Sequence, residues 1–291
     1  MRRPGEILAE QKAMETIVSL TSAFESLSSM KIAQTKRKVL ISKQFFNEVW
    51  NIYKQIRMDV IFNFGRAADE EPIDKELLIL ITAPAGLSGD IDHRLIKRFQ
   101  EYYQDRPEAF DIIVIGRHGA QQLQQLKIKY KYYFDLPKRD YINVDPLMVE
   151  IRKYKKSRVF YQSYVSLGEQ RIEDLDLGEV VNQMGRIADL DTVDDEKITE
   201  RNYIFEPSPY TVAAHMETSI LRLTLTQFIY DSRLAQTASR FRAMSAAKER
   251  SQEMAQDLRT QYQRAKRAQV DTRLKESLAG LKKLRMEQDY V

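Results

Sequence analysis

The chain has 291 residues and a net charge of +4; 43% of its residues are hydrophobic and none is cysteine. The missing thiols exclude a disulfide framework, a thiolate metal site and a cysteine nucleophile. The first residues, MRRPGEILAEQKAMETIV, lack the apolar core of a secretory signal, and no window approaches the roughly 20 apolar residues of a membrane helix. We therefore expect a soluble, cytoplasmic protein without a membrane span.

Residues 6–64 contain neither proline nor glycine and are expected to form one long helix. Apolar residues recur there at steps of three and four, which places them along one side of a helix. The first run is Met14, Ile17, Leu20, Phe24 and Leu27, and the second is Val49, Ile52, Ile56 and Val60. This spacing is typical of one half of a coiled coil. The predicted N-terminal helical part covers residues 1–64.

Residues 65–208 show a different period and are expected to form a compact α/β domain. Short apolar runs at 76–82 and 110–116 end in turn residues, as strands buried on both faces of a parallel sheet do. A helix-like stretch follows each run, and another at 145–155 precedes a third strand-like run at 157–165. Strands and helices that alternate at these lengths predict a small, doubly wound, Rossmann-like sheet.

The end of this domain is acidic. Residues 166–202 hold 11 acidic residues against 4 basic ones and are expected to form a hairpin or loop. The stretch YIFEPSP, residues 203–209, then predicts a last short strand and a proline-marked helix start.

Residues 209–291 are predicted to form a second long helix, because beyond Pro209 the chain has no proline and only Gly280. Two apolar groups share a helical face: Leu258, Tyr262 and Ala265, then Leu274, Leu278 and Leu281. A helix from residue 210 to 286 would be about 115 Å long, so most of its length must find a partner. We expect the two terminal helices to form an antiparallel two-helix coiled coil that carries the α/β insert.

Signals for catalysis are weak. The loop at residues 82–90 has two glycines after a strand, but neither the spacing of a dinucleotide fingerprint nor the ending of a P-loop. The histidines, His93, His118 and His215, have no second ligand at helical spacing, which argues against a metal site. Asp90 and Asp92 are interpreted as helix N-caps rather than an acid–base pair. No catalytic, cofactor-binding or metal-binding residue is predicted, and the chain is not expected to be an enzyme.

The last helix is basic, with 15 Lys and Arg against 9 Asp and Glu in residues 210–291. The stretch QYQRAKRAQ, residues 261–269, interleaves tyrosine with basic residues and raises the possibility of nucleic-acid binding. Acidic residues interrupt the charge along the helix, however, and a solvated helix face is the favoured interpretation.

Several motifs resemble the gamma subunit, the central stalk of F-type ATP synthases. They are TSAFESLSSMKI (21–32), LLILITAPAGLSGDID (77–92), FDIIVIGRHGA (110–120), YIFEPSP (203–209), ASRFRAMSAAKERS (238–251) and LRTQYQRAKRAQ (258–269). They follow the family's order over nearly the whole chain. The resemblance implies an antiparallel coiled coil inside a ring of alternating alpha and beta subunits. It also implies an α/β domain that meets an epsilon-type subunit and the membrane rotor ring.

The resemblance implies partner contacts to the alpha/beta ring at five residues. Phe24 stands where the family has methionine beside the lower beta-subunit region, and Lys31 matches the lysine of the first-helix signature. Arg240 matches an arginine of the coupling contacts, and a solvated helix face is the alternative for this residue. Lys266 and Arg267 occupy the positions of an Arg-Gln pair that meets a loop of the catalytic ring.

The sequence also departs from the family pattern. Ala83, Pro84 and Ala85 replace a Ser-Asp-Arg step, and Asp271 and Arg273 replace threonine and glutamate. A rotor of an F-type-like ATPase not coupled to ATP synthesis is therefore the first alternative. A basic helical nucleic-acid or scaffold protein is the second, and a nucleotide-binding enzyme the third.

Overall fold

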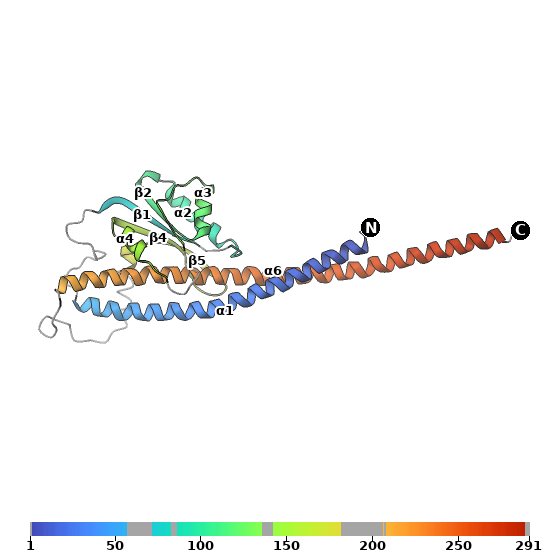
Figure 1. The fold of residues 1–291 in the computed structure, drawn as a ribbon, viewed down its shortest axis with the longest axis horizontal. Helices are drawn as coiled ribbons and strands as arrows, with labels where there is room; N and C mark the ends of the chain where they lie inside the picture. The colour runs from blue at the N-terminus through green and yellow to red at the C-terminus, as the bar shows by residue number, and fades with distance from the viewer. Residues whose placement is uncertain are drawn as a thin grey trace. The chain divides into compact units, whose positions relative to one another are not determined.

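The computed structural model describes residues 2–56, 72–82, 86–135, 142–181, 206 and 208–288. The chain divides into two compact units, one formed by Met1–Leu27 with Ala243–Val291 and the other by Ser28–Arg242. Helices α1 (Pro4–Ile56) and α6 (Pro209–Gln288) each contribute to both units (Figure 1). The domain boundaries expected after residues 64 and 208 stay a prediction, because the first lies outside the described residues.

The second unit contains a five-stranded sheet in the order β3-β2-β1-β4-β5. Its strands are β1 (Ile73–Ile81), β2 (Phe110–Ile115), β3 (Tyr132–Phe134), β4 (Tyr154–Tyr164) and β5 (Gln170–Asp176). Strands β1 to β4 pair in parallel, whereas β5 pairs antiparallel with β4. The three predicted strands and the described part of the acidic hairpin are confirmed. The strand predicted within 203–209 falls largely outside the described residues.

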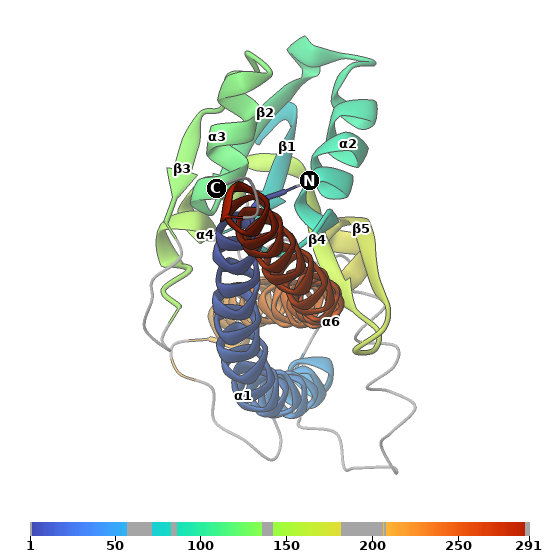
Figure 2. The ribbon, with the colours of Figure 1, turned by 90° about the vertical axis from the view of Figure 1, so that its right-hand side faces the viewer.

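Both faces of the sheet are buried. Successive side chains of β1 point to opposite faces, and helices cover each face. Leu78 and Leu80 pack with α2 (Ile91–Tyr103) and α3 (Arg117–Gln125), which lie beside β1 and β2 in Figure 2. Ile79 and Ile81 pack on the other face with α4 (Asp145–Ile151) and α6. A short 3-10 helix, Pro107–Ala109, leads into β2. The doubly wound α/β prediction is confirmed.

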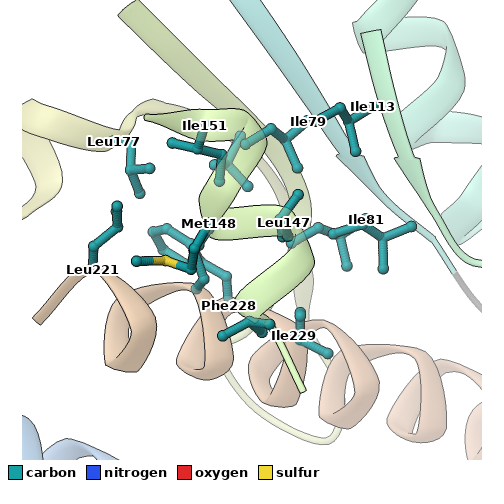
Figure 3. Packing of buried hydrophobic residues seen from close by; sticks show 14 of the residues in the cluster. Ile79, Ile81, Ile113, Leu147, Met148, Ile151, Leu177, Leu221, Phe228 and Ile229 are labelled. Atoms are coloured by element: carbon teal, nitrogen blue, oxygen red, sulfur yellow. The ribbon is translucent and has the colours of Figure 1, made fainter. Parts of the chain in front are cut away.

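Figure 3 shows how α6 joins this core. Leu147 and Met148 of α4 lie between the sheet and the α6 residues Phe228 and Ile229. Each of these four side chains is at most 3% exposed. Apolar packing therefore holds the first part of α6 to the sheet domain.

The lower part of α1 also packs on α6 within the second unit. Phe46, Trp50 and Tyr53 form an aromatic row that is buried against Ile220. The Tyr53 hydroxyl donates a hydrogen bond of 2.7 Å to the Glu217 carboxylate. This cluster fixes the pairing of the two helices beside the sheet.

In the first unit, α1 and α6 form a coiled coil with a regular seam. The covered α1 positions are Ile7, Gln11, Met14, Val18, Thr21 and Glu25, and those of α6 are Met244, Lys248, Ser251, Ala255, Leu258, Tyr262 and Ala265. The steps alternate between three and four residues, which is the heptad repeat of a coiled coil. Together with the Tyr53–Glu217 bond, the Glu25–Lys248 pair shows that the two helices run antiparallel.

The prediction that the apolar stripe of α1 packs in the coiled coil is wrong. Ile17, Leu20, Phe24 and Leu27 are 38%, 55%, 39% and 51% exposed, and of that run only Met14 lies in the seam. The seam is shifted by one residue and contains Thr21 and Glu25. Small or polar residues at these positions hide the seam from an analysis that follows apolar periodicity. Of the second run, Val49 is half-buried and Ile52 is exposed, the side chain of Ile56 is not described, and Val60 lies outside the described residues.

Candidate functional site

Arg240 of α6 lies against the turn that follows β1. Its Nη2 donates to the Gly86 carbonyl and to Ser88 Oγ, both over 3.2 Å. The neighbouring Ser239 hydroxyl donates to the Ser88 carbonyl over 2.6 Å. Burial lowers the pKa of the Arg240 guanidinium, and the negative charge of Asp92 opposes this shift. Arg240 is thus a half-buried group that holds the glycine turn, rather than a solvated side chain.

The glycine loops at this end of the sheet have a structural role. Gly116 has φ +100°, and a Cβ there would collide with the Thr82 carbonyl oxygen. A Cβ on Gly119 would lie 2.6 Å from the Thr82 side chain, whose Oγ1 accepts a hydrogen bond from the Gly119 N–H over 2.9 Å. Close approach of the Thr82 backbone at Gly116, and of the Thr82 side chain at Gly119, therefore favours glycine at both positions. Residues Ala83, Pro84 and Ala85 of the first loop lie outside the described residues.

A buried polar network lies beside this turn and joins four elements. Asp92 of α2 accepts from Gln162 Nε2 of β4 over 2.8 Å, and its second oxygen lies 2.9 Å from His118 Nδ1 of α3. Gln162 Oε1 accepts from Ser232 Oγ over 2.5 Å and from Gln236 Nε2 over 3.0 Å, both on α6. Sequence analysis missed this network because its members are far apart in the chain.

The N-cap interpretation of the two aspartates needs correction. Asp90 is the N-cap of α2 but makes no side-chain capping hydrogen bond. Asp92 is 4% exposed and belongs to the polar network instead. Polar residues at otherwise apolar, buried positions of the strands and helices were the one signal in the sequence that pointed to this network.

The other predicted partner residues lie on exposed helix surfaces. Phe24 and Lys31 are on α1, where Phe24 belongs to the exposed apolar stripe. Lys266 and Arg267 are exposed on α6, and Lys266 Nζ lies 5.9 Å from the centre of the Tyr262 ring. No described contact joins these four residues to one another. The exposure of all four residues is compatible with contacts to a partner, whereas Arg240 contacts its own chain.

The end of α6 exposes a further apolar stripe. Val270, Leu274, Leu278 and Leu281 are between 50% and 63% exposed. In contrast, Leu258 is 8% exposed and Tyr262 and Ala265 are half-buried, as their shared face predicted. This apolar stripe is thus left uncovered by the described part of the chain.

Among the residues that the structure describes, no helix is both long and apolar enough to cross a membrane. The same residues contain no cluster of three metal-ligating side chains.

The fold defines a class of proteins in which a mixed sheet is inserted between two long helices that pair with each other. The chain belongs to the ATP synthase family, whose model matches residues 6–284. An ATP synthase gamma chain of Trichlorobacter lovleyi is 22% identical over 276 residues, which cover 91% of this chain and 93% of the relative. The resemblance to gamma subunits is confirmed.

Two solved structures have a similar fold. A chain of the Euglena gracilis mitochondrial ATP synthase, described as OSCP/F1/c-ring in rotational state 3, has a TM-score of 0.66 at 12% identity, covering 98% of this chain and 96% of its own. A chain of the rotor of the same synthase in rotational state 1 has a TM-score of 0.60 at 12% identity and covers 91% and 99%. Fold is thus retained at very low sequence identity.

Proposed function

We propose that this chain is the central rotor stalk of an F-type ATP synthase or ATPase, without catalytic residues of its own. The paired helices stand inside a ring of alternating alpha- and beta-type subunits. The sheet domain meets an epsilon-type subunit and the membrane rotor ring, so that the complex is peripheral to the cytoplasmic side of the membrane. Rotation couples ion translocation to nucleotide binding in the ring.

The single observation that carries this proposal is the exposed apolar surface of the terminal helices. A coiled coil that only stabilised itself would place its large apolar residues in the seam. Here Thr21, Glu25 and Ser251 occupy the seam, while Leu20, Leu27 and Leu274 are more than half exposed. The similar Euglena chains belong to an assembly described as OSCP/F1/c-ring and to a rotor, which supports the same function.

Coupling follows from differential binding. If the stalk contacts each beta-type subunit differently, it biases their conformations unequally, and rotation changes which subunit is favoured. Phe24, Lys31, Lys266 and Arg267 are proposed as ring contacts. Arg240 is proposed to act in coupling through the glycine turn that it holds.

The test is purification of the native complex through a tag on this chain. Alpha- and beta-type subunits in threefold excess, together with ATP hydrolysis, are the expected result. Recovery of the chain alone, or with nucleic acid that salt removes, would contradict the proposal. ATP synthesis by the complex in sealed vesicles distinguishes a synthase from a rotor that only hydrolyses ATP.

A further inference from the structure

Gln162 connects three elements through a single amide group. It is 0% exposed at the end of β4. Its Nε2 donates to Asp92 of α2 over 2.8 Å, and its Oε1 accepts from Ser232 and Gln236 of α6 over 2.5 and 3.0 Å. Gln236 Nε2 also donates to Ser232 Oγ over 3.0 Å. One side chain therefore links the sheet to both helices.

The chemistry of Asp92 determines which way this amide points. Asp92 Oδ1 accepts a hydrogen bond from the NH₂ of Gln162, so the carbonyl oxygen of the same amide points away from Asp92. The carbonyl oxygen of Gln162 then faces α6, and α6 must provide donors there. Ser232 and Gln236, one helical turn apart, provide them. In this arrangement of α6 against the sheet, the α6 donors meet the acceptor of Gln162.

Apolar packing alone does not require particular donors to meet particular acceptors. Leu225, Phe228 and Ile229 attach the preceding turns of α6 to the sheet, but the hydrophobic effect is non-directional and tolerates small rotations of a helix. Hydrogen bonds to buried groups are directional, and leaving a buried donor or acceptor unpaired destabilises the fold. The bonds of Ser239 and Arg240 to the turn after β1 continue the same face of α6.

We infer that Gln162 and Asp92 are positioning residues that fix the rotation of α6 about its own axis relative to the sheet domain. In a rotor, this junction passes torque between α6 and the sheet domain without slip. The role in passing torque rests on the proposed function, whereas the role in fixing the rotation of α6 concerns the folded chain alone. The two are therefore tested by separate measurements.

The test exchanges donors and acceptors within the network. Gln162→Glu places a second carboxylate against Asp92 and removes the donor between them. Adding Asp92→Asn restores a donor, because the introduced amide can direct its NH₂ at the new carboxylate and its carbonyl oxygen at His118. Ser232→Ala removes one α6 donor without adding charge, and it remains informative if Gln162→Glu fails to fold. Asp145→Asn is the control, since it breaks a solvent-exposed ion pair between Arg222 of α6 and the α4 end of the sheet domain.

The first readout is the distance distribution between spin labels on cysteines introduced at Lys97 of α2 and His215 of α6, both exposed. The natural chain has no cysteine, so labelling is specific. We expect a second or broadened distance population in Gln162→Glu, a smaller change in Ser232→Ala, and the parental distribution in Asp92→Asn/Gln162→Glu and in Asp145→Asn. Parental distributions in Gln162→Glu and Ser232→Ala, or no recovery in the double variant, would overturn the inference.

The second readout is ion transport per ATP hydrolysed by the purified complex in sealed vesicles. Gln162→Glu should lose coupled transport while retaining hydrolysis, and the double variant should recover it. Unchanged coupling despite an altered distance distribution would overturn the torque role. If the parental chain enters no complex with alpha- and beta-type subunits, the proposed function fails, while the distance measurement still decides the positioning role.

Discussion

Lys248 Nζ donates a hydrogen bond of 2.9 Å to Glu25 Oε2 and so joins the first and last helices across 223 positions of sequence. Both residues occupy seam positions of the coiled coil, where larger apolar side chains are usual. The side chain of Lys248 is 30% exposed and that of Glu25 is 20% exposed, so the pair is only partly screened by water. A partly exposed ion pair thus stands in the seam in place of an apolar contact.

This pair predicts a pH-dependent contribution to stability. The hydrogen bond from Lys248 lowers the pKa of Glu25 below its ordinary value of 4.5. Because the folded chain binds the proton less tightly than the unfolded chain, the contribution is present above pH 4.5 and is lost as the pH falls through the folded pKa. We expect Glu25→Gln to cost about 0.5–1 kcal/mol at about pH 7 in urea unfolding, and the cost should decrease as the pH falls below 4.5. A double-mutant cycle with Lys248→Met should show coupling, whereas additivity would contradict the prediction.

The carboxyl group of Asp231 predicts the opposite dependence of stability on pH. Burial raises its pKa from 3.8 to about 6, with the Tyr164 N–H as an opposing hydrogen bond. Since the folded state binds the proton more tightly, the stability due to this group is complete below pH 3.8 and is lost as the pH rises to about 6. Asp231→Asn keeps the acceptor and should raise the free energy of unfolding at about pH 7 by up to about 2 kcal/mol. Equal stability of the two proteins at neutral pH would refute this.

Gly116 is expected to tolerate no side chain. Its positive φ and the collision of a Cβ with the Thr82 carbonyl predict that Gly116→Ala destabilises the chain by about 2–4 kcal/mol. Gly280→Ala is the matched control, because that glycine is helical and has open space around it. The control should stabilise α6 by about 0.5–1 kcal/mol. Thermal unfolding followed by circular dichroism measures both, and similar melting temperatures for the two variants would contradict the assignment.

The exposed stripe of α6 predicts a variant that folds but does not assemble. Leu274→Asp/Leu278→Asp should leave the melting temperature of the isolated chain unchanged, because the two side chains are 57% and 60% exposed. Recovery of alpha- and beta-type subunits with the tagged chain should fall, since a charge must then be desolvated in the contact. Thr272→Asp introduces the same charge on a neighbouring face and should retain the partners. Full recovery with the double variant would exclude this stripe as a ring contact.

A substitution of Arg240 is expected to reduce coupling more than assembly of the complex. Arg240→Glu removes the bonds to Gly86 and Ser88 and brings a negative charge toward Asp92, so the turn after β1 should lose its position. We expect complexes to assemble with reduced ATP synthesis per ion transported. Arg240→Lys should show a smaller loss. Unchanged rotation and synthesis in Arg240→Glu would remove the proposed role.

The architecture was largely predictable from sequence. The long segments without proline or glycine predicted α1 and α6, and the apolar runs around Ile79 and Ile113 predicted β1 and β2, because local composition determines these elements. Strand β3, Tyr132–Phe134, was missed because three residues are too short to show a period.

The coiled-coil seam and the Gln162–Asp92 junction were harder to predict from the sequence. Apolar periodicity selected Leu20 and Leu27, whereas packing covers Thr21 and Ser28, so an exposed apolar stripe resembled a coiled-coil core. The Gln162–Asp92 bond spans 70 residues, and no local pattern announces such a pair. Tertiary contacts between distant polar residues follow from the fold and become visible only with it.

Rotation of this chain within the native complex tests the central claim most directly. A cysteine introduced at Lys97 carries a bead or gold particle, while the alpha- and beta-type subunits are fixed to a surface. The account predicts rotation in one direction that requires ATP and stops when the paired helices are cross-linked to the ring. A particle that stays still while the same complexes hydrolyse ATP, or one that keeps rotating after the paired helices are cross-linked to the ring, would contradict it.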